Sequence, residues 1–215
     1  MSILAQSTAE LVLLLIVLSD FLVLGTLRLS ACIRAIALQG GLLALLPIVT
    51  AGFSVHSVIL SATTLLVKGG ALPWLLAWAI REASIRREVE PLVSSMASML
   101  LGAVALGLAF AVASRLPKGA QGGLLVPVAL MTLIAGLVVL ITRSKAVSQV
   151  VGYLMLENGV YLFGLRQAAR VPFLVEIAVL LDVFVGVFIM GIVVFHINRE
   201  FDSISAAKLT ELRES

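Results

Sequence analysis

Apolar runs of about twenty residues recur along most of this 215-residue chain, and they limit what it can fold into. A helix of that length spans the hydrocarbon core of a bilayer, which is about 30 Å thick. Because 61% of the residues are hydrophobic and only 13% are charged, the chain cannot build the polar surface of a water-soluble globule. Lipid cannot satisfy bare backbone groups, so the spans must be helical. The sequence therefore predicts an all-α, polytopic membrane protein.

The runs divide the chain into about seven transmembrane helices joined by short connections. These predicted helices are Glu10–Leu27, Ile33–Thr50, Val55–Ile80, Pro91–Ser114, Gly122–Ile141, Ala146–Leu165 and Pro172–Ile197. We group them as a four-helix membrane region over residues 1–121 and a three-helix region over residues 122–198. Residues 199–215 form a cytoplasmic tail, and residues 81–90 form the one sizeable polar loop.

Basic residues near the ends of the spans predict the orientation, because lysine and arginine in short loops prefer the cytoplasmic side. If the first connection is cytoplasmic, ten basic residues fall on that side and four on the other. The ten are Arg28, Arg34, Arg81, Arg86, Arg87, Arg143, Lys145, Arg199, Lys208 and Arg213, and the four are Arg115, Lys118, Arg166 and Arg170. The N-terminus is therefore predicted to lie outside and the C-terminus in the cytoplasm.

Several classes of function lack their motifs in this sequence. There is no GxxxxGK[ST] phosphate loop, no GxSxG elbow and no HExxH zinc helix. The two histidines, His56 and His196, fall near opposite membrane faces and cannot share a haem iron, and the single Cys32 cannot form an intramolecular disulfide. A net charge of +3 reflects the loop bias and offers no nucleic-acid surface. We therefore expect no catalytic, metal or cofactor site in this chain.

Three ionisable residues, Glu157, Asp182 and Lys68, lie deep within the predicted spans. Each is twelve residues from a membrane-face residue, Lys145, Arg170 or His56 respectively, which corresponds to about 18 Å at a rise of about 1.5 Å per residue. The three side chains are therefore predicted to form a row at one depth.

Charges inside a membrane are expensive and usually functional, but they can also serve packing. Low-dielectric surroundings disfavour the charged form of both carboxyl and ammonium groups, so a proton can be exchanged at modest cost. That property suits a proton or ion relay through Glu157, Asp182 and Lys68. The alternative is that the same groups pair with one another and fix how the helices pack.

A helix break is predicted directly after Lys68, in the segment TTLLVKGGALP of residues 63–73. Gly69 and Gly70 weaken the helix, and Pro73 removes one backbone hydrogen bond and leaves a carbonyl free for water or a side chain. Broken helices at membrane depth line hydrated paths. An ordinary proline kink with close packing at the glycines is the other interpretation.

Four further residues are secondary candidates. Asp20 lies within the first span, where we expect it to face a partner or water. Glu176 lies one turn inside the external end of the last span, as an exit-side proton group or a wet interfacial residue. His56 is expected at the membrane interface, and Tyr153 is a weaker polar candidate one turn before Glu157.

Two segments carry a family resemblance: RSKAVSQVVGYLMLENGVYL at residues 143–162 and PFLVEIAVLLDVFVG at residues 172–186. With the segment around Lys68, they resemble component E of hydrogenase 4 over nearly the whole chain. Residues 122–197 are similar to the small K subunit of respiratory complex I and the C subunit of Mrp-type antiporters. On this resemblance Glu157 takes the place of a membrane glutamate, and Asp182 stands in for a second acid.

The resemblance implies a membrane-arm subunit of an energy-converting hydrogenase in a prokaryotic cytoplasmic (inner) membrane. Its partners would be antiporter-like membrane subunits and a hydrophilic hydrogenase module that holds the nickel-iron centre and the iron-sulfur clusters. The chain itself would carry no cofactor and would contribute to proton or sodium translocation. Two alternatives stay open: a structural adaptor between the antiporter-like subunits and the hydrophilic module, and a free-standing small ion transporter.

Overall fold

The computed structural model describes residues 3–82, 92–116, 123–167, 182 and 184–191, and every regular element among them is helical. The elements are α1 (Ile3–Gly25), α2 (Leu29–Ala51), α3 (Val55–Thr64), the π-helical segment η1 (Leu65–Ala71), α4 (Leu72–Glu82), α5 (Ser95–Ser114), α6 (Leu125–Thr142) and α7 (Ala146–Gln167). Residues 184–191 are also helical. The all-α prediction is confirmed for this part of the chain.

Five helices of the described chain are long and apolar enough to cross a membrane: Leu4–Gly25, Leu29–Ala51, Val55–Arg81, Ser95–Ser114 and Leu125–Thr142. They correspond to the first five predicted spans, and the third runs through α3, η1 and α4 without leaving the helix. The protein is therefore a membrane protein with several transmembrane helices.

The sixth and seventh predicted spans are not among these five helices. Helix α7 has 22 residues, enough for about 33 Å, but its buried polar side chains lower its hydropathy below that of the other five. Most of the seventh span, Pro172–Ile197, lies outside the described residues, as do the tail at 199–215 and most of the polar loop at 81–90. Seven spans and the orientation of the termini stay predictions.

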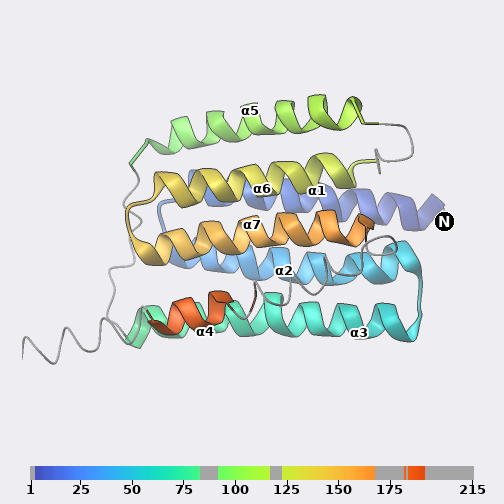
Figure 1. Ribbon diagram of the computed structural model, residues 1–215, viewed down its shortest axis with the longest axis horizontal. Coiled ribbons are helices and arrows are strands. Elements are labelled where there is room, and N and C mark those ends of the chain that lie inside the picture. Colours follow the sequence, from blue (N-terminus) through green and yellow to red (C-terminus); the bar gives the residue numbers. More distant parts are fainter. Residues whose placement is uncertain (1–2, 83–91, 117–122, 168–181, 183, 192–215) are drawn as a thin grey trace, which may run out of the picture.

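The helices run roughly parallel or antiparallel in one elongated bundle (Figure 1). Helix α5 lies at one edge against α6 and α1, and the α3–η1–α4 rod lies at the opposite edge against α2. Between these edges α6 packs along α7, and α2 contacts both α1 and α7. The helices of the predicted four-helix and three-helix regions thus pack directly on each other.

Glycines allow α6 and α7 to approach at backbone distance. A Cβ on Gly152 would lie 2.6 Å from the backbone nitrogen of Leu140, and one on Gly159 would lie 2.6 Å from that of Leu133. A Cβ on Gly136 would overlap the backbone of Leu156. Small residues at a helix interface permit such packing in lipid, where association depends on close van der Waals contact.

Arg143, which follows α6, is buried rather than exposed in a loop. Its Nη2 donates to the carbonyl of Leu24 at the end of α1, 3.3 Å away, and its own carbonyl accepts from the side chain of Gln149. Burial lowers the pKa of the Arg143 guanidinium. The contact holds the α1–α2 and α6–α7 connections at the same end of the bundle (Figure 1).

Candidate functional site

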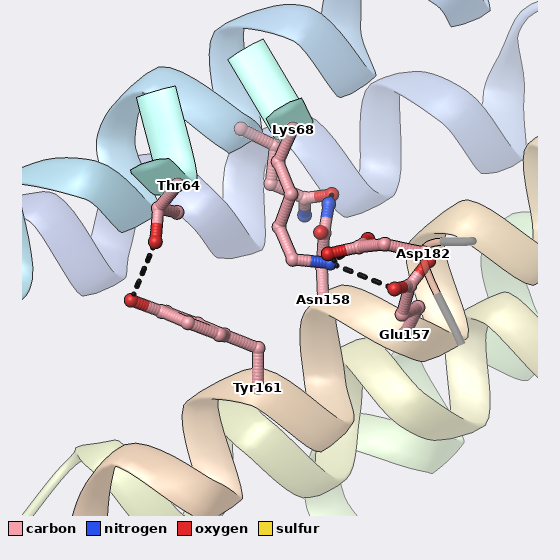
Figure 2. Close-up of polar contacts among 7 residues, drawn as sticks. Thr64, Lys68, Glu157, Asn158, Tyr161 and Asp182 are labelled. Atoms are coloured by element: carbon pink, nitrogen blue, oxygen red, sulfur yellow. Dashed lines mark hydrogen bonds and ion pairs between the residues drawn. The ribbon is translucent and has the colours of Figure 1, made fainter. Parts of the chain in front are cut away.

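The structure brings Lys68, Glu157 and Asp182 together inside the bundle. Lys68 Nζ lies 3.0 Å from Glu157 Oε1 and donates a hydrogen bond to Asp182 Oδ1 at 2.8 Å. Lys68 and Glu157 are 5% and 0% exposed, and Asp182 is 14% exposed. Figure 2 shows the lysine reaching from η1 toward both acids. We call these three residues the charged centre.

The backbone that carries Lys68 is a π-helical turn. The amide of Leu72 bonds the carbonyl of Val67, the i→i+5 pattern that defines this geometry. The predicted break at Gly69, Gly70 and Pro73 therefore takes the form of a change in hydrogen-bond register, and the chain stays helical through it. Such π turns occur frequently at functional sites.

Glycines of α2 set the position of this π turn. A Cβ on Gly40 would overlap the carbonyl of Lys68 and would lie 2.7 Å from the amide nitrogen of Gly69. Gly69 in turn faces α2, since a Cβ added to it would lie 3.4 Å from the amide nitrogen of Gly41. The close approach of α2 therefore fixes the height at which Lys68 meets α7.

Charge within the centre is unbalanced. One ammonium can neutralise one carboxylate, and the second acid needs a proton or another cation to be neutral. Glu157 is completely buried, and its Oε1 forms an ion pair with Lys68 Nζ. The arrangement therefore has the charge to accommodate one further proton or cation.

A tyrosine borders the charged centre. Tyr161, one turn after Glu157 on α7, shares a hydrogen bond of 2.9 Å with the hydroxyl of Thr64 on α3 (Figure 2). Its ring centroid lies 5.9 Å from Lys68 Nζ, within the range of a cation–π interaction. Tyr161 thus contacts the charged centre and ties α7 to the α3–η1 rod.

A second polar cluster contains Asp20, and here the expectation was wrong. Asp20 is 0% exposed and faces neither water nor an outer surface. Gln39 Nε2 donates to its Oδ1 at 2.7 Å, and Thr132 Oγ1 donates to its Oδ2 at 2.8 Å. Asn158 Nδ2 in turn donates to Gln39 Oε1 at 3.0 Å. Four helices, α1, α2, α6 and α7, each contribute one residue.

The structure gives different places to the other secondary candidates. His56 is exposed at the start of α3, at a helix end as expected. Tyr153 is half-buried one turn before Glu157, where its ring contacts Phe184 and borders a cavity of about 130 Å³. Glu176 lies outside the described residues.

Metal binding finds no support in the described chain, where no group of three or more histidine, cysteine or acidic residues could hold an ion. The lone Cys32 is buried against apolar neighbours. These features define a class of protein: a polytopic helical membrane protein with a buried charged centre and a separate buried carboxyl in a neutral polar cluster.

Comparison with known proteins then gives the family. The chain belongs to the family of the uncharacterized protein Rv0085 of Mycobacterium tuberculosis, with which it is 35% identical over 205 residues, 93% of each chain. It is also 27% identical to hydrogenase-4 component E of Escherichia coli K12 and of Shigella flexneri, over 71% of this chain and 72% of theirs. No protein-family profile and no solved structure matches the chain.

Sequence reasoning missed part of both clusters. Thr132 and Asn158 are neutral residues that the sequence does not single out, and Gln39 is only a weak polar candidate within the second predicted span. Thr64 and Tyr161 meet across 97 residues of sequence. One signal was present: Asn158 directly follows Glu157, and Gln39 directly precedes Gly40. A polar side chain beside a small residue in an apolar helix marks a helix interface.

Proposed function

We propose that the protein is a membrane-arm subunit of an energy-converting hydrogenase-like complex. In this function the charged centre contributes to proton or sodium translocation that is coupled to redox chemistry in partner subunits. The 27% identity to hydrogenase-4 component E supports the type of complex. The observation that carries the role of this chain is the pairing of one lysine with two acids inside a membrane protein.

The mechanism follows from the charge balance. A translocated cation or proton that enters neutralises the acid that Lys68 leaves unpaired, and its departure restores the negative charge. Lys68 can shift between Glu157 and Asp182, because both oxygens lie within 3.0 Å of its Nζ. Redox chemistry in a partner must favour one arrangement over the other, since transfer in one direction requires a coupling free energy between the two sites.

The partners proposed for this chain are antiporter-like membrane subunits and a hydrophilic hydrogenase module in a prokaryotic cytoplasmic membrane. The nickel-iron centre and iron-sulfur clusters would belong to that module. Co-purification of the tagged chain in mild detergent, followed by mass spectrometry, tests this. Hydrogenase and antiporter-like subunits in stoichiometric amounts are expected, whereas a solitary chain would favour a free-standing transporter.

The translocation role is tested with Glu157→Gln in the intact complex. The substitution keeps the size of the side chain and removes its charge, so we expect assembly at the native level and loss of ion transfer per electron. Glu10→Gln, on the exposed surface of α1, is the matched control and should transport normally. Native transport in Glu157→Gln would contradict the role of the charged centre.

A structural adaptor is the second candidate, and the short ion pairs favour it. Buried pairs that break leave an uncompensated charge, so the centre can serve simply to hold the α3–η1–α4 rod against α7. This function predicts that Glu157→Gln lowers the amount of assembled complex while each assembled complex still transports ions at the native ratio.

A further inference from the structure

Asp20 is a buried acid that the charged centre does not use. Its carboxyl accepts two hydrogen bonds, one on each oxygen, and both donors are neutral. No described cation contacts it: α5 and α6 carry no charged residue, and the one charge on α2 is Arg34, whose side chain is exposed and bonds the carbonyl of Ser30. A carboxylate withdrawn from water without a cation is costly, so this group is suited to holding a proton.

Uptake of a proton changes what the neighbours of Asp20 must do. The ionised carboxylate only accepts hydrogen bonds, whereas the protonated acid also donates one. Gln39 now presents Nε2 to the acid and Oε1 to Asn158. If its amide rotates by half a turn, Oε1 accepts from the acid and Nε2 faces Asn158, which must rotate likewise and offer its own oxygen. The amide chain therefore has two polarities, each matched to one charge state of Asp20.

The far end of this amide chain lies next to the charged centre. Asn158 is the residue after Glu157 on α7, and Figure 2 shows the two residues next to each other on that helix. Reversal of two buried amide dipoles changes the electrostatic potential at Glu157 and Lys68, because interactions are weakly screened in a low-dielectric interior. The two amides thus offer a route by which the charge state of Asp20 can change the potential at Glu157.

We propose that Asp20 is a second proton-binding site of this protein and that the Gln39–Asn158 amide pair transmits its charge state to the charged centre. This inference rests on the proposed function, since it adds a regulating proton to the same translocation step. It assigns a titratable role to Asp20, a hydrogen-bond switch to Gln39 and Asn158, and a positioning role to Thr132.

Infrared difference spectroscopy of the full-length protein in lipid vesicles, on changing pH, tests the proton-binding site. We expect a carbonyl stretching band from a protonated carboxyl that disappears in Asp20→Asn and persists in the control Glu10→Gln. Gln39→Leu keeps the acid but removes one hydrogen bond, so the band should remain and change frequency. Identical carboxyl bands in the parent and in Asp20→Asn would overturn the proposal.

Transmission to the charged centre is tested by the pH midpoint of the band that Glu157→Gln removes. Gln39→Leu breaks the amide chain and should therefore shift that midpoint. The proton concentration at the midpoint should change by about 5–150-fold, the range found for coupled binding sites. An unchanged midpoint would overturn the transmission. Ion transport in the intact complex separates the two proposals. If transport is impaired in Glu157→Gln but native in Asp20→Asn, only this inference is contradicted. If transport is native in Glu157→Gln, the proposed function is contradicted.

Discussion

At the scale of single residues, Lys68 is central to the site, because it pairs with two acids that no other described cation contacts. Its ammonium compensates charge that would otherwise be buried alone. The stability of the bundle and the proposed function therefore depend on the same side chain.

Removal of that ammonium should destabilise the protein. Lys68→Met keeps the apolar stem and leaves two acids facing each other, and breaking a buried pair in this way costs about 3–5 kcal/mol. The measurement is the midpoint of thermal unfolding in mild detergent. The triple variant that adds Glu157→Gln and Asp182→Asn removes all three charges and should recover most of the loss; no recovery would show that the ion pairs are not the cause.

The Thr64–Tyr161 hydrogen bond gives a smaller, separable prediction. Tyr161→Phe keeps the ring near Lys68 but removes the hydroxyl, so we expect a loss of about 0.5–1.5 kcal/mol of unfolding free energy. Thr64→Val removes the other partner. In a double-mutant cycle the two losses should be less than additive, and strict additivity would mean that the bond contributes nothing.

Among the residues of the two clusters, those with charge stand out in the sequence, whereas most of the neutral ones do not. Lys68, Glu157 and Asp182 stand out because charge is rare in apolar runs, and their common depth follows from the helix rise alone. Asp20 was identified as a candidate, but its surroundings were predicted wrongly. The sequence of one helix does not show which of its faces another helix covers. Its neutral donors on α2 and α6 became visible only through packing.

At the scale of elements, the α2–η1 contact controls the site. The π turn holds Lys68 at the height of Glu157, and α2 touches its backbone through glycine. Sequence predicted the existence of this irregular segment from Gly69, Gly70 and Pro73 but not its geometry. A proline and two glycines weaken an α-helix without specifying which hydrogen-bond register replaces it.

Neighbouring glycines on α2 offer a matched test of this contact. Gly40→Ala adds a methyl group against the Lys68 carbonyl, so η1 must move away from α2 and Lys68 from Glu157. We expect a lower unfolding midpoint and impaired ion transfer. At Gly41 a methyl group would meet only the side chain of Leu65, at 4.0 Å, and Gly41→Ala should be close to native. Equal effects at both positions would contradict the contact.

The α6–α7 interface permits a similar comparison. Gly136→Ala places a methyl group on the backbone of Leu156, and overpacking of this kind costs about 1–3 kcal/mol. A methyl group on Gly107 of α5 would meet no described atom within 4 Å, so Gly107→Ala should be neutral or stabilise the helix by up to about 1 kcal/mol. Thermal unfolding of both variants in detergent measures the difference.

At the scale of the whole molecule, alternating connections place basic residues unevenly. The α1–α2 and α6–α7 connections lie at one end, where the described chain carries Arg28, Arg81, Arg143 and Lys145, and the α2–α3 connection lies at the other (Figure 1). The alternation of connections between the two ends could be predicted from the sequence, because the length of each apolar run shows where a span begins and ends. It could not predict the lateral order of the helices, which depends on which small residues meet.

Orientation can be tested with single cysteines. In a Cys32→Ala background, Leu27→Cys is exposed in the α1–α2 connection, and Phe53→Cys is exposed between α2 and α3. With the N-terminus outside, a membrane-impermeant maleimide should label position 53 in intact cells and position 27 only in inverted vesicles. The reverse pattern would invert the topology.

The charged centre also determines an order of events during synthesis. Lys68 and Asp182 are 114 residues apart in sequence, so the lysine enters the membrane long before its hydrogen-bonded acid has been made. Until then its charge must be sheltered by the insertion machinery, by water or by a neighbouring subunit, because an isolated ammonium in lipid is costly. Final docking of the α3–η1–α4 rod therefore belongs to a late stage of biogenesis, after the C-terminal region has been inserted.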